Sequence, residues 1–290
     1  MRMRPRAKAF RASAVCLAAL LPVSVHAEGI DTEHLFGFMI GTDVGNVGER
    51  EFQSETTGSF GKNGGRYRAI GQEFELEFVP ARNFRVEIGS TFASHRISGV
   101  PGLADQRRLS WQGGSLDLRY RFLNRESAPF GLTFAAEAHV HRVDETTAEA
   151  VRSFGTEFRL AFDRELVPNR VVAAFNLIYE PEWTRFVGNG VMVRESRAGV
   201  ALGLMAQLRP DFLLGREARY LRKYDGIGLE GFSGQALFVG PTAYFQLSKY
   251  SRLTASWSIQ AWGRSAGSTA SLDAVNFERQ QARLVFGVNF

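Results

Sequence analysis

The chain has 290 residues, with 35 Lys and Arg against 30 Asp and Glu, which describes a mildly basic protein of one or two domains. Five of the cations and no acid lie within the first 27 residues, so the rest of the chain balances 30 cations against 30 acids. This balance argues against a basic surface for nucleic acid. The mean hydropathy is −0.15, and no run of about 18 apolar residues occurs, which excludes a helical membrane protein.

Residues 1–27 carry the three features of a secretory signal peptide in order: a cationic start, an apolar run and a cleavage site. The cations end at Arg11, the apolar run spans residues 12–25, and Val25-His26-Ala27 places small residues for cleavage before Glu28. The alternative is an N-terminal anchor helix. We disfavour it because the run is interrupted by Pro22 and is too short to cross a bilayer.

Cys16, the only cysteine of the chain, lies inside this apolar run. Val15 precedes it where a lipoprotein signal would place a small residue, so we expect no lipid attachment. The mature chain then has no thiol. Hydrogen bonds and packing must hold it together without disulfides or cysteine metal sites.

Residues 28–47 fit the strand pattern less well and contain the apolar stretch Leu35-Phe36-Gly37-Phe38-Met39-Ile40. A strand here would make the total strand count odd, which single-chain bacterial barrels avoid. We therefore expect an N-terminal extension that lies in the periplasm or inside the lumen of a barrel formed by residues 48–290.

From residue 48 onward, apolar and polar residues alternate in blocks separated by Gly, Pro, Asn, Asp and Ser, a pattern typical of β-strands. In the last block, Leu284, Phe286 and Phe290 share one face, while Arg283 and Asn289 share the other. Such blocks predict strands at 48–60, 66–78, 84–97, 110–122, 130–143, 153–163, 170–186, 191–208, 212–224, 234–247, 253–263 and 276–290.

Alternation of this kind fits either a soluble sandwich or a transmembrane barrel. The export signal, the terminal Phe290 and blocks long enough to cross a bilayer at about 9 to 11 tilted residues favour the barrel. Connections after even-numbered blocks are short and several after odd-numbered blocks are longer, as in outer-membrane barrels with short periplasmic turns. We predict an all-β antiparallel transmembrane β-barrel of about 12 strands, preceded by a cleaved signal peptide.

The signal peptide and the last strand, Gln281-Ala-Arg-Leu-Val-Phe-Gly-Val-Asn-Phe290, resemble those of Gram-negative outer-membrane β-barrel proteins. This resemblance implies location in the cell outer membrane and insertion by the barrel assembly machinery, with Phe286, Val288 and Phe290 as the assembly signal. Residues 41–50 and 180–185 are similar to uncharacterised barrels grouped with the phenol-degradation MetA-like transporters. That likeness implies transport by analogy.

Charged residues of both signs occupy the face expected to line the lumen. One interpretation is a ladder of ion pairs that fills a narrow interior, because a buried charge is tolerated only when it is paired. The other is a charge-lined pore that orients polar solutes, and both hold if a narrow path remains. The candidate pore-lining residues are Glu73, Glu75, Arg85, Glu87, Asp117, Arg119, Arg121, Glu137, His139, Glu157, Arg159, Glu217, Arg219 and Arg283.

Few residues suggest metal binding or catalysis. Glu137, His139 and His141 share a strand face, but side chains two apart on a strand lie about 7 Å from one another, so we predict no metal site. Ser94 and His95 point to opposite faces and cannot form a nucleophile and base pair. No phosphate or dinucleotide motif occurs in a credible context, and we expect no cofactor and no enzymatic activity.

These features predict an outer-membrane barrel that gives small polar solutes passive passage through its lumen. One alternative is a structural or surface-interaction barrel without conductance. Another is an outer-membrane lipid hydrolase, which would need a Ser/His pair on the lipid-facing rim. The expected partners are outer-membrane lipid, the barrel assembly machinery during biogenesis and small solutes, but not nucleic acid.

Overall fold

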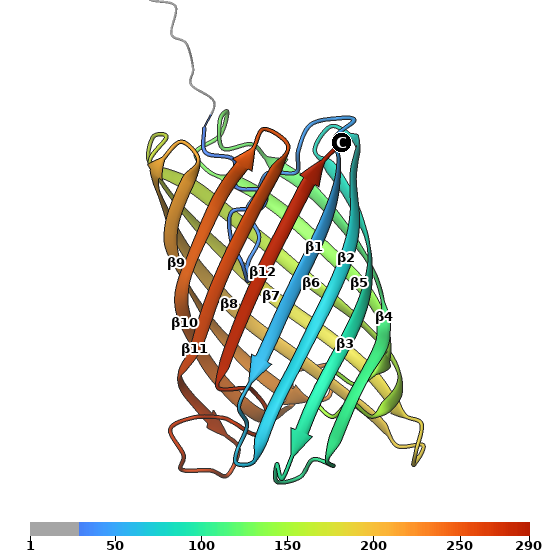
Figure 1. Ribbon diagram of the computed structural model, residues 1–290. Coiled ribbons are helices and arrows are strands. Elements are labelled where there is room, and N and C mark those ends of the chain that lie inside the picture. Colours follow the sequence, from blue (N-terminus) through green and yellow to red (C-terminus); the bar gives the residue numbers. More distant parts are fainter. Residues whose placement is uncertain (1–28) are drawn as a thin grey trace, which may run out of the picture.

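The protein forms a closed antiparallel barrel of twelve strands (Figure 1). The structure is a computed structural model that describes residues 29–290, so the predicted signal peptide lies outside the described residues. Each strand pairs with its sequence neighbours, and β1 closes the barrel against β12, which confirms the predicted fold class. The strands are β1 (Arg50–Phe60), β2 (Arg66–Ala81), β3 (Phe84–Ser98), β4 (Gln106–Leu123), β5 (Gly131–Val143), β6 (Ala150–Val167), β7 (Val171–Phe186), β8 (Met192–Arg209), β9 (Phe212–Asp225), β10 (Gly231–Ser248), β11 (Ser251–Ser265) and β12 (Gln280–Asn289).

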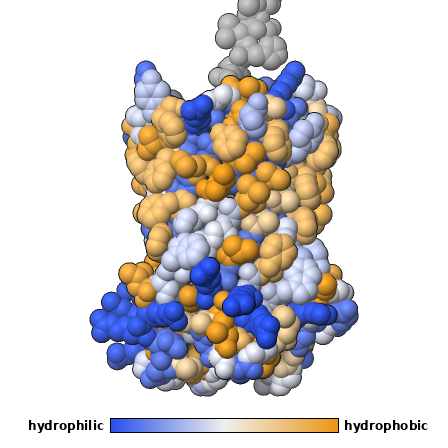
Figure 2. Space-filling model, turned by 90° about the vertical axis from the view of Figure 1, so that its right-hand side faces the viewer, coloured by the Kyte–Doolittle hydropathy of each residue, from blue (hydrophilic) through white to orange (hydrophobic). Residues whose placement is uncertain are grey.

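The alternation of the sequence places apolar side chains outside and polar side chains inside. On β2, Phe74 and Leu76 are 41% and 54% exposed, whereas Glu77 between Leu76 and Phe78 is 4% exposed. Figure 2 shows apolar side chains over the upper part of one face and hydrophilic side chains gathered at the lower end. The outer surface therefore has the apolar band that a membrane-spanning barrel needs.

The two ends of the barrel differ in their connections. Residues 82–83, 168–170, 210–211 and 249–250 make tight turns at the end that also holds the C-terminus, here called the short-turn end. Two of these turns place an asparagine in the left-handed region, Asn83 at a φ of 65° and Asn169 at 54°, which asparagine tolerates better than most residues. The opposite, long-loop end includes the longest connection, residues 266–279.

The last strand begins later than predicted, at Gln280 instead of residue 276. Phe277 does not continue the strand but turns inward and packs against Phe238 of β10, with ring centroids 6.2 Å apart. Asp273 of the same connection is fully buried and accepts a hydrogen bond from Ser265 Oγ at 2.5 Å. The connection therefore folds over the mouth of the barrel at the long-loop end.

Residues 29–49 enter the barrel at the short-turn end, turn inside it and return to the start of β1 (Figure 1). We call them the lumenal segment. Within residues 29–290, no helix is long and apolar enough to cross a membrane.

Candidate functional site

The lumenal segment is buried although it has no regular secondary structure. Thr32, Thr42 and Val44 are fully buried, and Leu35 is 1% exposed. Where an irregular backbone is buried away from water, its polar groups must find hydrogen-bond partners on the barrel wall. The wall contacts of this segment therefore determine whether the lumen is closed at the short-turn end.

Glu217 of β9 supplies one set of these partners. Its carboxylate accepts hydrogen bonds from the backbone N–H groups of Gly37 and Phe38 at 2.7 and 2.9 Å. Thr242 of β10 also donates to it, at 2.5 Å. A Cβ at Gly37 would collide with the hydroxyl of Ser256, so only glycine lets the backbone approach this wall. Glu217 thus holds the tip of the lumenal segment.

Asp163 of β6 supplies a second set. Its Oδ2 accepts from Thr32 Oγ1 at 2.6 Å and from the Thr42 N–H at 2.9 Å, and its Oδ1 accepts from Thr42 Oγ1 at 2.7 Å. Thr133 of β5 completes the contact by donating to the Thr42 carbonyl at 2.6 Å. Both arms of the lumenal segment are therefore fastened to the same part of the wall.

Asp43 links the segment to two arginines near the short-turn end. Its carboxylate lies 2.6 Å from Arg125 Nη2 and 3.1 Å from Arg121 Nη1. Burial alone would raise the pKa of Asp43, but the nearby Arg125 guanidinium and the Thr32 N–H outweigh it and lower the pKa below its ordinary value. Asp43 therefore stays ionised and paired at neutral pH.

One side of the lumenal segment is apolar and matches an apolar part of the wall. Leu35, Phe36 and Met39 join one buried cluster with inward-facing residues of β7 to β10 and of the last connection: Val172, Ala174, Ile178, Ala201, Met205, Leu213, Leu221, Ala236, Phe238 and Phe277. A Cβ at Gly203 of β8 would lie 2.8 Å from Met39 Sδ. The segment packs closely here because the wall residue has no side chain.

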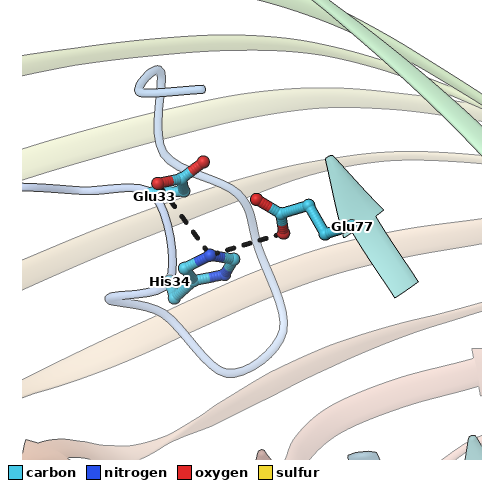
Figure 3. A group of neighbouring side chains, drawn as sticks. All are labelled: Glu33, His34 and Glu77. Atoms are coloured by element: carbon cyan, nitrogen blue, oxygen red, sulfur yellow. Dashed lines mark ion pairs between the residues drawn. The ribbon is translucent and has the colours of Figure 1, made fainter. Parts of the chain in front are cut away.

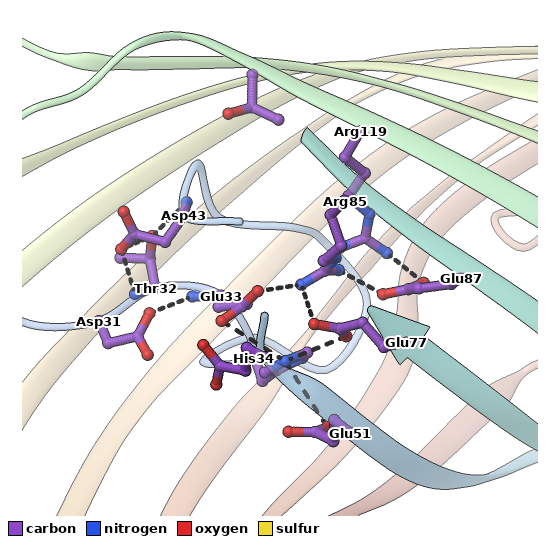
Figure 4. A network of polar contacts seen from close by, with 12 residues as sticks. Asp31, Thr32, Glu33, His34, Asp43, Glu51, Glu77, Arg85, Glu87 and Arg119 are labelled. Atoms are coloured by element: carbon purple, nitrogen blue, oxygen red, sulfur yellow. Dashed lines mark hydrogen bonds and ion pairs between the residues drawn. The ribbon is translucent and has the colours of Figure 1, made fainter. Parts of the chain in front are cut away.

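The opposite side of the segment meets charged residues of β2 and β3 (Figure 4). Arg85 is fully buried and contacts three carboxylates: Glu33 at 2.7 Å, Glu77 at 3.4 Å and Glu87 at 2.5 Å. Arg119 of β4 contacts the second oxygen of Glu87 at 3.0 Å. A buried guanidinium is stable only with such partners, so this network joins the segment to the wall through charge.

The ring of Phe38, at the tip of the segment, lies between two arginines of the wall. The guanidinium carbons of Arg219 and Arg283 are 4.0 and 4.9 Å from its centroid. Both distances are within the range of cation–π attraction. The tip therefore contacts β12 as well as β9, which holds its backbone.

A cavity of about 590 Å³ lies beyond the lumenal segment toward the long-loop end. Its floor includes Phe38 and Met39, and it reaches connection residues 144–147 and 275–278 at the far end. Thirteen Asp and Glu residues line it, against seven Lys and Arg residues. The cavity is therefore a polar chamber with an excess of carboxylates.

The fourteen candidate pore-lining residues all have their side chains inside the barrel. Arg85, Arg121 and Glu217 contact the lumenal segment, and Asp117 pairs with Arg119 at 2.6 Å. Whether these residues line a solute path stays a prediction. The ten that line the cavity are Glu73, Glu75, Glu87, Arg119, Glu137, His139, Glu157, Arg159, Arg219 and Arg283.

The residues of the predicted assembly signal lie at the end of the chain. Phe286 and Phe290 are 38% and 72% exposed, and Val288 pairs with Phe52 where β12 closes on β1. Their recognition by an assembly machinery stays a prediction.

The sequence analysis did not identify several residues that hold the lumenal segment. Glu33, His34 and Asp43 belong to a stretch without periodicity, and Asn176 is a single polar residue in a strand. The one sequence feature that pointed to this segment was the apolar stretch 35–40, which contains Gly37 and lies outside the alternating blocks. Such a stretch indicates burial, but it does not predict which residues of the barrel wall contact it.

His139 has different neighbours from those expected. Its ring stacks on His141 with centroids 4.8 Å apart, closer than the strand spacing suggests because the two side chains lean toward each other. The donor atoms near it belong to Glu180 and Glu182 of β7, within 4.8 Å of one another, and not to Glu137. His95 is buried inside the barrel, with Nε2 2.8 Å from the Glu145 carbonyl.

Residues 28–290 match the model of DUF6662, described as a family of unknown function. No curated protein matches the chain.

Among solved structures, the fold is similar to the COG4313 outer membrane channel from Pseudomonas putida F1, with a TM-score of 0.58 and 12% identity over 86% of this chain and 98% of that one. The NanC porin has a TM-score of 0.48 and 8% identity over 82% of this chain and 100% of its own. The translocator domain of autotransporter NalP from Neisseria meningitidis has a TM-score of 0.48 and 14% identity, covering 86% of this chain and 91% of its own. The likeness to the Pseudomonas channel is one of fold, and it confirms the predicted resemblance to outer-membrane β-barrels.

Proposed function

We propose that the chain, which belongs to the DUF6662 family of unknown function, is an outer-membrane channel for small polar solutes. In this proposal the short-turn end faces the periplasm, as in other barrels of this kind. The lumenal segment is the barrier, and the polar chamber beyond it is the entrance from outside.

The observation that carries the proposal is the cavity of about 590 Å³ inside the barrel. A lumen packed only for stability would be filled by its own side chains, as small barrels are. This lumen instead keeps a charged chamber on one side of a segment that is held by hydrogen bonds, ion pairs and packing. Such a barrier can move aside without breaking a covalent bond or a strand pair.

The charge of the chamber suggests which solutes it favours. Carboxylates outnumber Lys and Arg among its lining residues, thirteen to seven. A ring of fixed carboxylates attracts cations and repels anions, so we expect a preference for cationic or neutral polar solutes.

The completeness of the barrier favours a second candidate, a structural barrel that conducts nothing. Thr32, Thr42 and Val44 are fully buried, so the segment leaves little free space at their level. A lipid hydrolase is less well supported, because His95 lies inside the barrel with its Nε2 at the Glu145 carbonyl, away from the lipid-facing rim.

Single-channel recording of the refolded protein in a planar bilayer separates these candidates. A channel gated by the lumenal segment predicts rare openings in the parent chain and more frequent openings in Glu217→Ala, which loses the acceptor for Gly37 and Phe38. Heat-modifiable migration in gels would check that each barrel is folded. If the folded parent protein and the folded Glu217→Ala variant both show no channel openings, the structural barrel is the better explanation.

A further inference from the structure

Three metal-ligating atoms converge where the lumenal segment meets β2 (Figure 3). They belong to Glu33, His34 and Glu77, one atom from each residue, and all lie within 4.8 Å of one another. His34 Nε2 lies 4.0 Å from Glu33 Oε2 and 3.5 Å from Glu77 Oε2. Glu33 and His34 are the middle residues of a turn, which directs both side chains toward the wall.

Neither distance is that of a hydrogen bond, which requires about 2.7–3.2 Å between an N–H donor and an oxygen. His34 Nε2 and Glu77 Oε2 are buried and have no hydrogen-bond partner within residues 29–290. The Glu77 side chain is only 3% exposed. Buried polar atoms of this kind are rare and usually indicate a missing partner, such as water or an ion.

The spacing suits a metal ion as that partner. Zinc binds imidazole nitrogen and carboxylate oxygen at about 2.0–2.2 Å, often with four ligands in a tetrahedron. Two such ligands stand roughly 3.4 Å apart. His34 and Glu77 already have nearly this separation, and a small rotation of the Glu33 carboxylate would bring it into range.

Arg85 holds the two carboxylates in the orientation that such a site requires. Its Nη1 contacts Oε1 of Glu33 at 2.7 Å and Oε1 of Glu77 at 3.4 Å, so the Oε2 atoms of both residues face His34. Arg85 itself is fully buried and also contacts Glu87. Outer partners of this kind typically fix the ligands of protein metal sites.

The charged residues connected to His34 include more acids than bases. Five acidic groups and three guanidinium groups form this connected, mostly buried set. Figure 4 shows the part of the set nearest to His34. The members of the set are Glu33, Glu51, Glu77, Glu87, Asp117, Arg85, Arg119 and Arg252.

We propose that Glu33, His34 and Glu77 form a binding site for a divalent transition-metal ion, with Zn²⁺ as the best-fitting ion and water as the remaining ligand. Glu33 and His34 line the cavity, so an ion can arrive through it. The site joins the lumenal segment to β2 and would exist whether or not the barrel conducts.

The group at His139 is the competing location. Its carboxylates already have close partners, since Arg197 Nε donates to Glu180 at 2.8 Å and Thr184 Oγ1 donates to Glu182 at 2.9 Å. An ion there would have to displace these contacts. In the other group, His34 Nε2 and Glu77 Oε2 have no hydrogen-bond partner within residues 29–290.

Isothermal titration of the refolded, chelator-stripped full-length mature protein with ZnCl₂ tests the proposal, and Co²⁺ absorption in the visible range reports the coordination. We expect one equivalent to bind, with affinity reduced at least about tenfold in His34→Gln and in Glu77→Gln, because each removes a ligand. His95→Gln is the matched control, since it alters a buried histidine elsewhere. Heat-modifiable migration checks that every variant is folded.

Several outcomes would overturn the proposal. They are absence of uptake by folded parent protein, equal affinity in the parent chain and both ligand variants, and loss of binding in His139→Gln alone. The first would mean that protons, and not a metal, balance the carboxylates around His34. The last would assign the ion to the His139 group.

Discussion

Asn176 of β7 binds the backbone of Ile40 as a neighbouring strand would. Its Nδ2 donates to the Ile40 carbonyl and its Oδ1 accepts from the Ile40 N–H, both at 2.9 Å. Asn176 is fully buried and Ile40 is 7% exposed, so water does not replace either bond. One side chain therefore satisfies both backbone groups of a residue that has no strand partner.

Replacing this amide should loosen the lumenal segment. Asn176→Ala leaves the N–H and the carbonyl of Ile40 buried without partners, at a cost of about 2–4 kcal/mol to docking of the segment. Met39→Cys offers a reporter, because Met39 is 4% exposed and the only native cysteine precedes the predicted cleavage site. A water-soluble maleimide should label this thiol faster when Asn176→Ala is also present.

The control for that experiment is Asn189→Ala, which removes an exposed asparagine whose amide oxygen accepts from the Val191 N–H. It should leave the labelling rate unchanged. Equal rates with and without Asn176→Ala would mean that the apolar contacts alone hold the segment.

Gly203 provides a steric test of the same segment. Gly203→Ala would place a methyl group 2.8 Å from Met39 Sδ and against Phe36, and such overpacking costs about 1–3 kcal/mol. We expect more frequent channel openings in planar bilayers. Gly188→Ala is the control, since a Cβ there meets no atom within 4 Å. Unchanged gating in folded Gly203→Ala would show that the segment can shift without opening a path.

The barrel could be predicted from the sequence because the direction of each side chain depends on its position within a single strand. Outside and inside alternate along each strand, so Phe74, Leu76 and Glu77 report their faces in a short window. The predicted start of β12 was wrong because Phe277 packs on Phe238, and this contact joins distant parts of the chain. No local pattern carries that information.

The wall partners of the lumenal segment could not be predicted for the same reason. Glu33 and Glu77 meet through a fold-back of the segment onto β2, and Arg85 joins them from β3. The spacing of these three residues in the sequence does not predict that they meet. By contrast, strand alternation correctly predicted the inward direction of Arg85.

Charge substitutions in the chamber should change ion selectivity in opposite directions. Glu182→Gln removes a carboxylate that lines the chamber, so reversal potentials in a salt gradient should shift toward anions. Arg159→Gln should shift them toward cations, because it removes a positive charge from the same lining. Glu126→Gln, in the turn between β4 and β5, should have no effect. A shift of the same sign in both chamber variants would contradict a charge-lined path.

Acid should release the anchor at Asp43. Its pKa is lowered from the ordinary 3.8, despite burial, mainly by Arg125. A lowered pKa in the folded state means that the carboxylate contributes stability above the unfolded value, and that this contribution is lost as the pH falls through the folded value. Asp43→Asn lacks the contribution at every pH. Its channel should open more often than the parent chain at pH 7. The difference should begin to shrink as the pH falls below the ordinary pKa of 3.8 and should vanish once the pH is below the lowered pKa of the folded state. Open probability measured in planar bilayers from pH 7 to pH 3 checks this expectation. A difference that persists undiminished at pH 3 would show that the ion pairs of Asp43 with Arg121 and Arg125 do not control the segment.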